Sequence, residues 1–143
     1  MSAPGALQGV PLRGISEVIL VVADVKRSAA FYREVVGLSP DDLGEKFAWF
    51  WAGSPGVSQR IGITAGPLSF GAAHIRGPMH FAFGTERARI PGLKRALEQK
   101  GIEVEGPVEF KFWNALSIYF SDPDDNRVEF CGFGDPPAPA GDT

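Results

Sequence analysis

The sequence predicts an α+β domain made of two tandem βαβββ modules. Two stretches of the chain share one order of elements, and each opens with a strand that is followed by an amphipathic helix. A segment rich in Gly and Pro, residues 64–78, separates the two stretches and has no periodicity. We expect one domain over residues 12–143, with modules at 12–66 and 77–133 and flexible tails at 1–11 and 134–143.

The first module begins with a β-branched strand over Ile15–Val22. Asp24 is a good N-cap, and apolar residues recur after it at helical spacing until Gly37 ends the pattern. Two further strands are predicted, at Phe47–Trp51 and Arg60–Thr64.

The second module repeats this order. Its first strand is predicted at Met79–Phe83, and its helix has Pro91 near its start and ends before Gly101. The segment Asp122–Asn126 is typical of a turn, and we assign it no catalytic role. The remaining strands are predicted at Val104–Val108, Leu116–Phe120 and Arg127–Cys131.

Composition excludes several classes of function. The formal net charge is −3 and Lys and Arg form no run, so we expect no nucleic-acid partner. The chain has no long apolar stretch and no signal-peptide pattern, so we expect a cytoplasmic protein without a membrane partner. Cys131 is the single cysteine, which excludes an internal disulfide and a Cys-rich zinc site. Any metal ligands must therefore be His and carboxylate side chains.

Alignment of the two modules places three ligand-capable side chains at matched positions. Glu17 in the first strand of one module falls opposite His80, and Gly62 in the last strand falls opposite Glu129. A buried carboxylate is costly unless it is paired or coordinated, and these groups can converge if the two sheets curve around a shared centre. Two carboxylates and an imidazole suit a divalent first-row metal and leave coordination positions open.

Each of these residues also has a purely structural interpretation. Glu129 could pair with Arg60 or Arg127, and His80 could be a core histidine with satisfied hydrogen bonds. His74 lies between the modules, either as an exposed loop residue or as part of a lid over the site.

Aromatic side chains are candidates for the walls of a ligand site. One pair shares a face of the strand Phe47–Trp51, and a second aromatic run follows the strand Val104–Val108. Such stripes either pack in a core or line an apolar pocket. The candidate substrate-binding residues are Trp49, Trp51, Arg60, His74, Phe112 and Trp113.

Three stretches of the chain resemble the signatures of a known family. The vicinal oxygen chelate superfamily, which includes glyoxalase I, fosfomycin-resistance enzymes, extradiol dioxygenases and bleomycin-resistance proteins, has signatures similar to GISEVILVVADVKRSAAFYREVVGL, GPMHFAF and SIYFSDPDDNRVEF. This resemblance covers Gly14–Phe133 and implies paired modules that form a curved, partly open sheet around a central cavity, in a homodimer. It implies the metal ligands Glu17, His80 and Glu129. The metal is expected to be Mn, Fe, Co, Ni or Zn.

Departures from the family signatures narrow the choice of member. Glu17 stands where the first ligand is usually His or Gln, and Gly62 stands where glyoxalase I has a fourth ligand. An extradiol dioxygenase has a second His ligand and a further His before its signature Tyr. Of these three residues, this chain has only the tyrosine, Tyr119. The resemblance therefore argues against ring cleavage, and three protein ligands match the fosfomycin-type enzymes.

Two functions of different classes are consistent with the sequence. The first is a divalent-metal-dependent, glyoxalase-like enzyme that acts on a small oxygen-chelating substrate, as a lyase or isomerase or as an epoxide-opening transferase or hydrolase. Its catalytic candidates are Glu17, as a base besides being a ligand, and Tyr119. The second is a metal-free, bleomycin-resistance-like protein that binds a drug in a cleft. That cleft would be lined by Trp49, Trp51, Trp113, Asp41, Asp42 and Glu45. Pairing of the modules within one chain or across two stays open.

Overall fold

The chain forms two four-stranded sheets, one from each module. The structure is a computed structural model that describes residues 9, 14–67 and 79–135. The first sheet has the strand order β1-β4-β3-β2 and the second β5-β8-β7-β6. The strands are β1 (Glu17–Val21), β2 (Ser39–Leu43), β3 (Phe47–Trp51), β4 (Arg60–Thr64), β5 (His80–Glu86), β6 (Glu105–Phe110), β7 (Ala115–Ser121) and β8 (Arg127–Phe133). In each sheet the first and last strands of the module are parallel neighbours. The predicted α+β class is confirmed.

Each module has one helix. Helix α1 (Val25–Ala30) begins after Asp24, whose side chain accepts a hydrogen bond from the backbone N–H of Arg27 at 3.1 Å. It continues as a π-helical segment, Phe31–Val36, which ends at Gly37 with a positive φ of 86°. Helix α2 (Ile90–Gln99) follows the 3₁₀ turn Arg87–Arg89. None of the helices in the described part of the chain is long and apolar enough to span a membrane.

Strand β2 is missing from the prediction. Its sequence, SPDDL, has Pro and two Asp residues, and all five of its residues are exposed. It forms nonetheless because β3 offers it an antiparallel edge, where a Pro without an N–H is tolerated. The strand completes the first module and makes it equivalent to the second.

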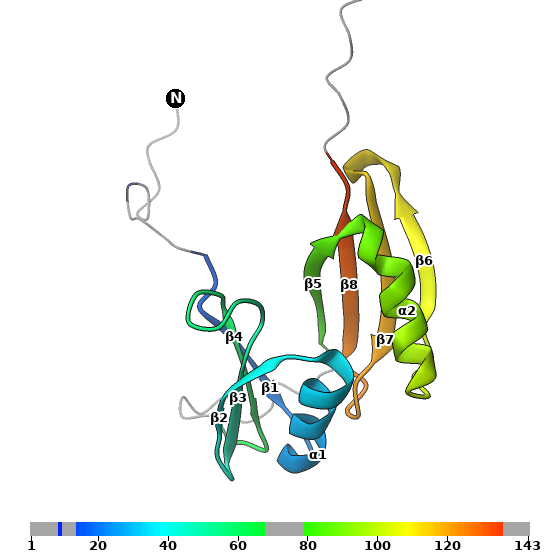
Figure 1. Cartoon of the computed structure of the whole chain (residues 1–143). Helices are drawn as coiled ribbons and strands as arrows, with labels where there is room; N and C mark the ends of the chain where they lie inside the picture. Colours follow the sequence, from blue (N-terminus) through cyan, green and yellow to red (C-terminus); the bar gives the residue numbers. More distant parts are fainter. Residues whose placement is uncertain (1–8, 10–13, 68–78, 136–143) are drawn as a thin grey trace, which may run out of the picture.

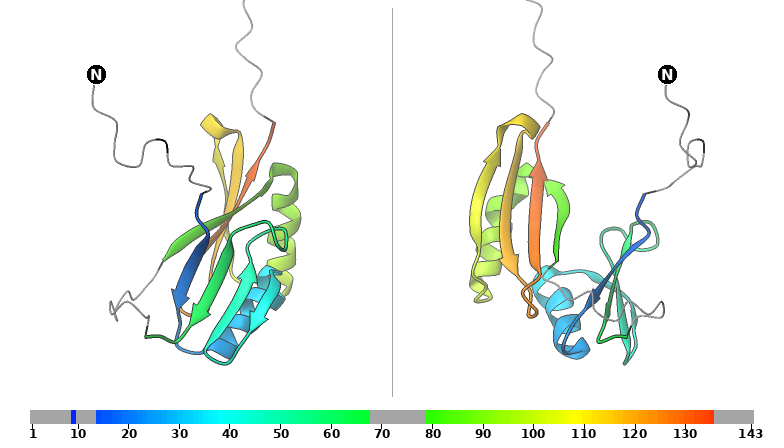
Figure 2. Two further views of the ribbon diagram at one scale, coloured as in Figure 1. Left: turned by 90° about the vertical axis from the view of Figure 1, so that its left-hand side faces the viewer. Right: turned by 180° about the vertical axis from the view of Figure 1, so that it is seen from behind.

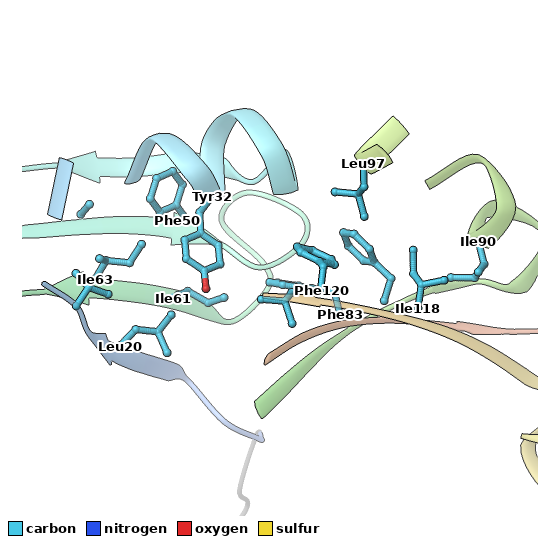
Figure 3. Packing of buried hydrophobic residues seen from close by; sticks show 14 residues of the cluster. Leu20, Tyr32, Phe50, Ile61, Ile63, Phe83, Ile90, Leu97, Ile118 and Phe120 are labelled. Atoms are coloured by element: carbon cyan, nitrogen blue, oxygen red, sulfur yellow. The ribbon is translucent and has the colours of Figure 1, made fainter. Parts of the chain in front are cut away.

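Helix α1 and its π-helical extension join the two modules. Figures 1 and 2 show that the two sheets stand apart, with α1 beside the first sheet and below the ends of β5 and β8. The ring of Phe31 lies 6.2 Å from that of Phe120, and the ring of Tyr32 lies 6.3 Å from that of Phe81. The buried apolar side chains therefore form one cluster that runs from the first module into the second (Figure 3).

Two carboxylates of the turn before β8 also bind the first module. The fully buried Tyr32 donates its hydroxyl hydrogen to Oδ2 of Asp122 at 2.6 Å. Asp124 accepts hydrogen bonds from the backbone N–H of Ala23 at 2.9 Å and from the hydroxyl of Ser28 at 3.1 Å. These polar contacts bridge about 100 residues of sequence and fix the orientation of one module on the other.

We predict that Tyr32→Phe lowers the free energy of unfolding by about 1–3 kcal/mol, because Asp122 loses a buried hydrogen-bond donor. The measurement is urea unfolding at pH 7, followed by circular dichroism. A variant as stable as the wild type would show that the hydroxyl does not contribute to the joint.

The hydrogen bond between Tyr32 and Asp122 also makes the free energy of unfolding depend on pH. Burial, and then the negative charge of Asp122, raise the pKa of Tyr32 above its ordinary value of about 10. The folded state then holds a proton that the unfolded state releases above pH 10, so this contribution to stability is complete below pH 10 and is lost as the pH rises. We expect the stability difference between wild type and Tyr32→Phe to shrink between pH 9 and pH 11. A constant difference would contradict this assignment.

Candidate metal centre

The parallel pairing of β5 with β8 brings His80 and Glu129 together. Nε2 of His80 lies 3.1 Å from Oε1 of Glu129, and the other oxygen of Glu129 accepts a hydrogen bond from the hydroxyl of Ser117 at 2.7 Å. The Glu129 side chain is 11% exposed, whereas the His80 side chain is 52% exposed. The pair therefore has a buried carboxylate at its base and an imidazole open to solvent.

The hydrogen-bond partner of Nδ1 determines which ring nitrogen of a neutral His80 carries the hydrogen. Nδ1 lies 3.1 Å from the backbone carbonyl oxygen of Arg127, which can only accept, so Nδ1 carries a hydrogen. In the neutral imidazole Nε2 then has a lone pair, and this lone pair faces the carboxylate oxygen of Glu129. Two such atoms at this distance share either a hydrogen, carried by one of them, or a metal ion.

The donor set fits a divalent metal. Metal–nitrogen and metal–oxygen bonds of about 2.1 Å that meet at a right angle place their two donor atoms about 3 Å apart. The separation of 3.1 Å between Nε2 of His80 and Oε1 of Glu129 matches this value. The hydrogen bonds from His80 to a backbone carbonyl and from Ser117 to Glu129 are of the kind that orient metal ligands.

Glu17 does not join this pair within one chain. It begins β1 in the first sheet and is exposed to solvent, whereas His80 and Glu129 lie in the second sheet. Figure 1 shows the strands β1 and β5 well apart. Within residues 14–67 and 79–135, no group of three His, Cys, Asp or Glu side chains could hold a metal ion. A single chain thus brings together His80 and Glu129 only.

The two arginines that we considered as partners of Glu129 bind other carboxylates. Arg60 donates to Asp41 at 2.9 Å, and Arg127 forms an ion pair with Glu105. The interpretation of Glu129 as the ion-pair partner of either arginine is therefore wrong. The exposure of His80 likewise overturns its interpretation as a core histidine.

Each arginine also packs on an aromatic ring. The guanidinium carbon of Arg60 lies 4.6 Å from the ring centre of Trp49, and that of Arg127 lies 5.7 Å from the ring centre of Tyr119. The two modules thus carry the same set of side chains, in which an arginine in the last strand is held by a carboxylate and an aromatic ring. In each module this arginine is the register partner of the first strand's candidate ligand, Glu17 or His80.

Tyr119 lies beside the pair. It is the register partner of Glu129 on β7, and its ring centre is 6.2 Å from that of His80. Burial raises the pKa of the Tyr119 hydroxyl, and the negative charge of Glu129 raises it further. The hydroxyl therefore stays protonated at neutral pH and is a hydrogen-bond donor there.

The other predicted substrate-binding residues do not all lie near the pair. Trp49 and Trp51 are half-buried on the open face of the first sheet. The side chains of Phe112 and Trp113 are 87% and 58% exposed, in the turn before Ala115, at the end of the second sheet opposite to His80. His74 lies outside the described residues. Hollows along α1 and at the start of α2 include neither His80 nor Glu129.

Sequence reasoning missed Ser117 and Glu105. Ser117 is fully buried and holds Glu129, and Glu105 neutralises Arg127. The alternation of side chains along β7 does place Ser117 and Tyr119 on one face. No signal of this kind identifies Glu105, because a shift of register in β6 separates it from Val108.

Comparison with known proteins agrees with this architecture. A curated relative, the metallothiol transferase FosB of Shouchella clausii (strain KSM-K16), is 24% identical over 119 residues, which are 82% of this chain and 79% of that protein. The solved lactoylglutathione lyase from Agrobacterium tumefaciens is 25% identical with a TM-score of 0.71, and the match covers 85% of this chain and 95% of that one. The integron cassette protein HFX_CASS4, from the mobile metagenome of the Halifax Harbour sewage outfall, is 28% identical with a TM-score of 0.70, over 85% of this chain and all 100% of that one.

A family model matches most of the chain. The model of the Glyoxalase/Bleomycin resistance protein/Dioxygenase superfamily matches residues 14–130, a range that includes β1, β5 and most of β8. The match covers most of the chain, and it includes Glu17, His80 and Glu129. The chain therefore belongs to the Glyoxalase/Bleomycin resistance protein/Dioxygenase superfamily.

Proposed function

We propose that the protein is a divalent-metal-dependent enzyme of the glyoxalase-like class, acting on a small substrate that binds through adjacent oxygens. His80 and Glu129 of one chain and Glu17 of a second chain hold the metal. The observation that carries the proposal is the contact of 3.1 Å between Nε2 of His80 and Oε1 of Glu129, on a ring whose Nδ1 is bonded to a backbone carbonyl oxygen.

The charges around this contact favour a metal over a proton. Arg60 and Arg127 are each neutralised by a carboxylate of their own module, so neither compensates a ligand. The carboxylates of Glu17 and Glu129 then remain as two negative charges, which one divalent cation balances. A protonated His80 would balance only one of them.

The shape of the chain supports a third ligand from a second copy. Among the described residues, strand β1 pairs with β4 alone and β5 pairs with β8 alone, so each leaves one edge unpaired there. In β1 Leu20 is buried and its apolar neighbours are half-buried, and Ile15 just before the strand is 66% exposed. An unpaired strand edge can take up a strand of another chain. In the proposed homodimer β1 of one chain lies next to β5 of the other, which places Glu17 beside the pair.

The residues of this site have distinct roles in the proposed reaction. A divalent metal held by His80 and Glu129, with Glu17 of a second chain, would supply Lewis-acid stabilisation of negative charge on the oxygens of the substrate. The hydroxyl of Tyr119 is protonated at neutral pH and donates a hydrogen bond or a proton to a substrate oxygen. Glu17 is the candidate base, because its carboxylate is exposed and has no ion-pair partner among the described residues. The enzyme names of the metallothiol transferase and lactoylglutathione lyase relatives support a catalytic role.

Metal-free binding of a cationic drug has less support. In the predicted drug-binding cleft Asp41 is already paired with Arg60. The ring of Trp49 has Phe47 stacked beside it and the guanidinium of Arg60 over it. Trp113 lies at the far end of the other sheet. Arg60 thus already contacts two members of the predicted cleft, and a third lies far from them.

We predict that the wild type binds close to one Mn²⁺ or Co²⁺ per chain, and that His80→Ala and Glu129→Gln each weaken binding by more than about 100-fold, because each removes a ligand. Elemental analysis after reconstitution and equilibrium dialysis measure this. Glu109→Gln is the matched control, since Glu109 lies on β6 and pairs with Arg87. A folded wild type that retains no metal, with imidazolium signals from His80 in the NMR spectrum at neutral pH, would refute the proposal.

A mixed dimer tests the origin of the third ligand. Homodimers of Glu17→Ala and of His80→Ala/Glu129→Gln should both fail to bind metal. If the site is shared between chains, a heterodimer of the two variants has one intact site, made of Glu17 from one chain and His80 and Glu129 from the other. We expect one metal per heterodimer, purified through two different affinity tags. No metal in the heterodimer would assign all three ligands to the same chain.

A further inference from the structure

The two faces of the second sheet have different surroundings. Ile118 and Phe130 lie on the face that α2 covers, and they belong to the buried apolar cluster. Because side chains alternate along a strand, their neighbours Ser117 and Glu129 point to the opposite, open face. His80 contacts Glu129 on that face. The residues further along the same strands are therefore the neighbours of the proposed metal site.

Beyond Glu129 the open face becomes apolar. The next two rows of side chains across β8, β7 and β6 contain six residues, and none of the six is charged. The rows are Cys131, Ser117 and Val108, followed by Phe133, Ala115 and Phe110. The row of Glu129, in contrast, contains Tyr119 and Glu105. The open face thus changes from polar to apolar along the direction of the strands.

Large apolar side chains of these rows are exposed to solvent. Val108 is 42% exposed and Phe133 is 50% exposed. Trp113 follows β6 and is 58% exposed, and its ring centre lies 5.8 Å from that of Phe110. We call Val108, Phe110, Trp113 and Phe133 the apolar strip. Adjoining exposed apolar side chains with polar groups at their border are typical of a binding surface.

The apolar strip lies away from the sheet edge that the proposed dimer uses. That contact joins β1 of one chain to β5 of the other, whereas the strip lies over β6, β7 and β8. Figure 1 shows β5 and β6 at opposite edges of the second sheet. Along β8 the strip ends at Phe133, four residues after Glu129, which is roughly 13 Å in an extended strand. A chain that begins at the metal can therefore run along the strip.

We infer that the substrate of the proposed site has an apolar tail, which the apolar strip binds while two adjacent oxygens at its other end bind the metal. This inference rests on the proposed metal site. A ligand of this kind matches the face at both ends, because its oxygens meet the polar row of Glu129 and its tail removes the exposed apolar side chains from water. The substrate class is thus an amphipathic chelator, such as one with an acyl chain.

Unbranched hydroxamates test this inference, because they share one chelating group and differ only in the length of the tail. Acetohydroxamate, butanohydroxamate, hexanohydroxamate and octanohydroxamate are titrated into the Co²⁺-loaded protein, and binding is followed by the visible absorption of Co²⁺. The metal–oxygen bonds are the same throughout the series. We expect the affinity to rise roughly two- to fourfold for each methylene group that reaches the strip.

Substitutions in the strip should act on the long hydroxamates alone. Val108→Thr keeps the shape of the side chain and makes it polar, and Phe133→Ser removes the ring. We expect each variant to weaken octanohydroxamate by about threefold or more, and to leave acetohydroxamate unchanged. Val57→Thr is the matched control, because Val57 is 84% exposed in the turn between β3 and β4 of the first module. It should change neither affinity.

The outcomes separate this inference from the proposed function. A wild type that binds no Co²⁺ refutes both. Co²⁺ binding with the same affinity along the whole hydroxamate series refutes the inference alone, and so does an equal loss of octanohydroxamate affinity in Val57→Thr. If the affinity is independent of tail length and Val108→Thr/Phe133→Ser sediments as a smaller species than the wild type, the strip is a contact between chains instead.

Discussion

The buried carboxylate of Asp122 connects the packing of the modules with the position of His80. One of its oxygens accepts from both the Tyr32 hydroxyl and the side-chain amide of Asn126. The amide oxygen of Asn126 in turn accepts from the backbone N–H of Met79, the residue before His80. Because burial leaves Asp122 without water to replace these donors, the whole turn has one favourable arrangement. The start of β5 is thereby fixed relative to α1.

From this fixed start the regular register of the second sheet places the remaining groups. His80 on β5 forms a hydrogen bond with the backbone carbonyl of Arg127 on β8. The side chain of Glu129, two residues after Arg127 on β8, contacts the imidazole of His80. The first sheet repeats this framework but ends in a glycine under an indole instead of a carboxylate. The two modules thus share one strand framework, with the carboxylate of Glu129 in the second and Gly62 under the indole of Trp49 in the first.

Much of the fold follows from the sequence, because periodicity and end signals are local. Strands β3 and β4 and the end of the π-helical segment at Gly37 agree with the prediction, whereas β2 depends on an edge provided by β3 and has no apolar pattern of its own. From the alignment of the repeats we expected Glu17, His80 and Glu129 to converge, and the structure brings His80 and Glu129 together. The alignment could not show that Glu17 stays apart from them, since the distance between the two sheets depends on how the modules pack.

The residue types of Asp122–Asn126 predict a turn but do not predict the residues that this turn contacts. Asp125 has a positive φ of 62° there. The partners of its carboxylates lie about 90–100 residues earlier in the chain, so nothing in the turn itself reveals that it joins the modules.

Anomalous X-ray diffraction from crystals grown with Mn²⁺ would locate the proposed metal. We expect one anomalous peak per chain, within bonding distance of Nε2 of His80 and Oε1 of Glu129, with Glu17 of the neighbouring chain as third ligand. A direct hydrogen bond between His80 and Glu129, with no anomalous peak beside them at saturating Mn²⁺, would contradict it.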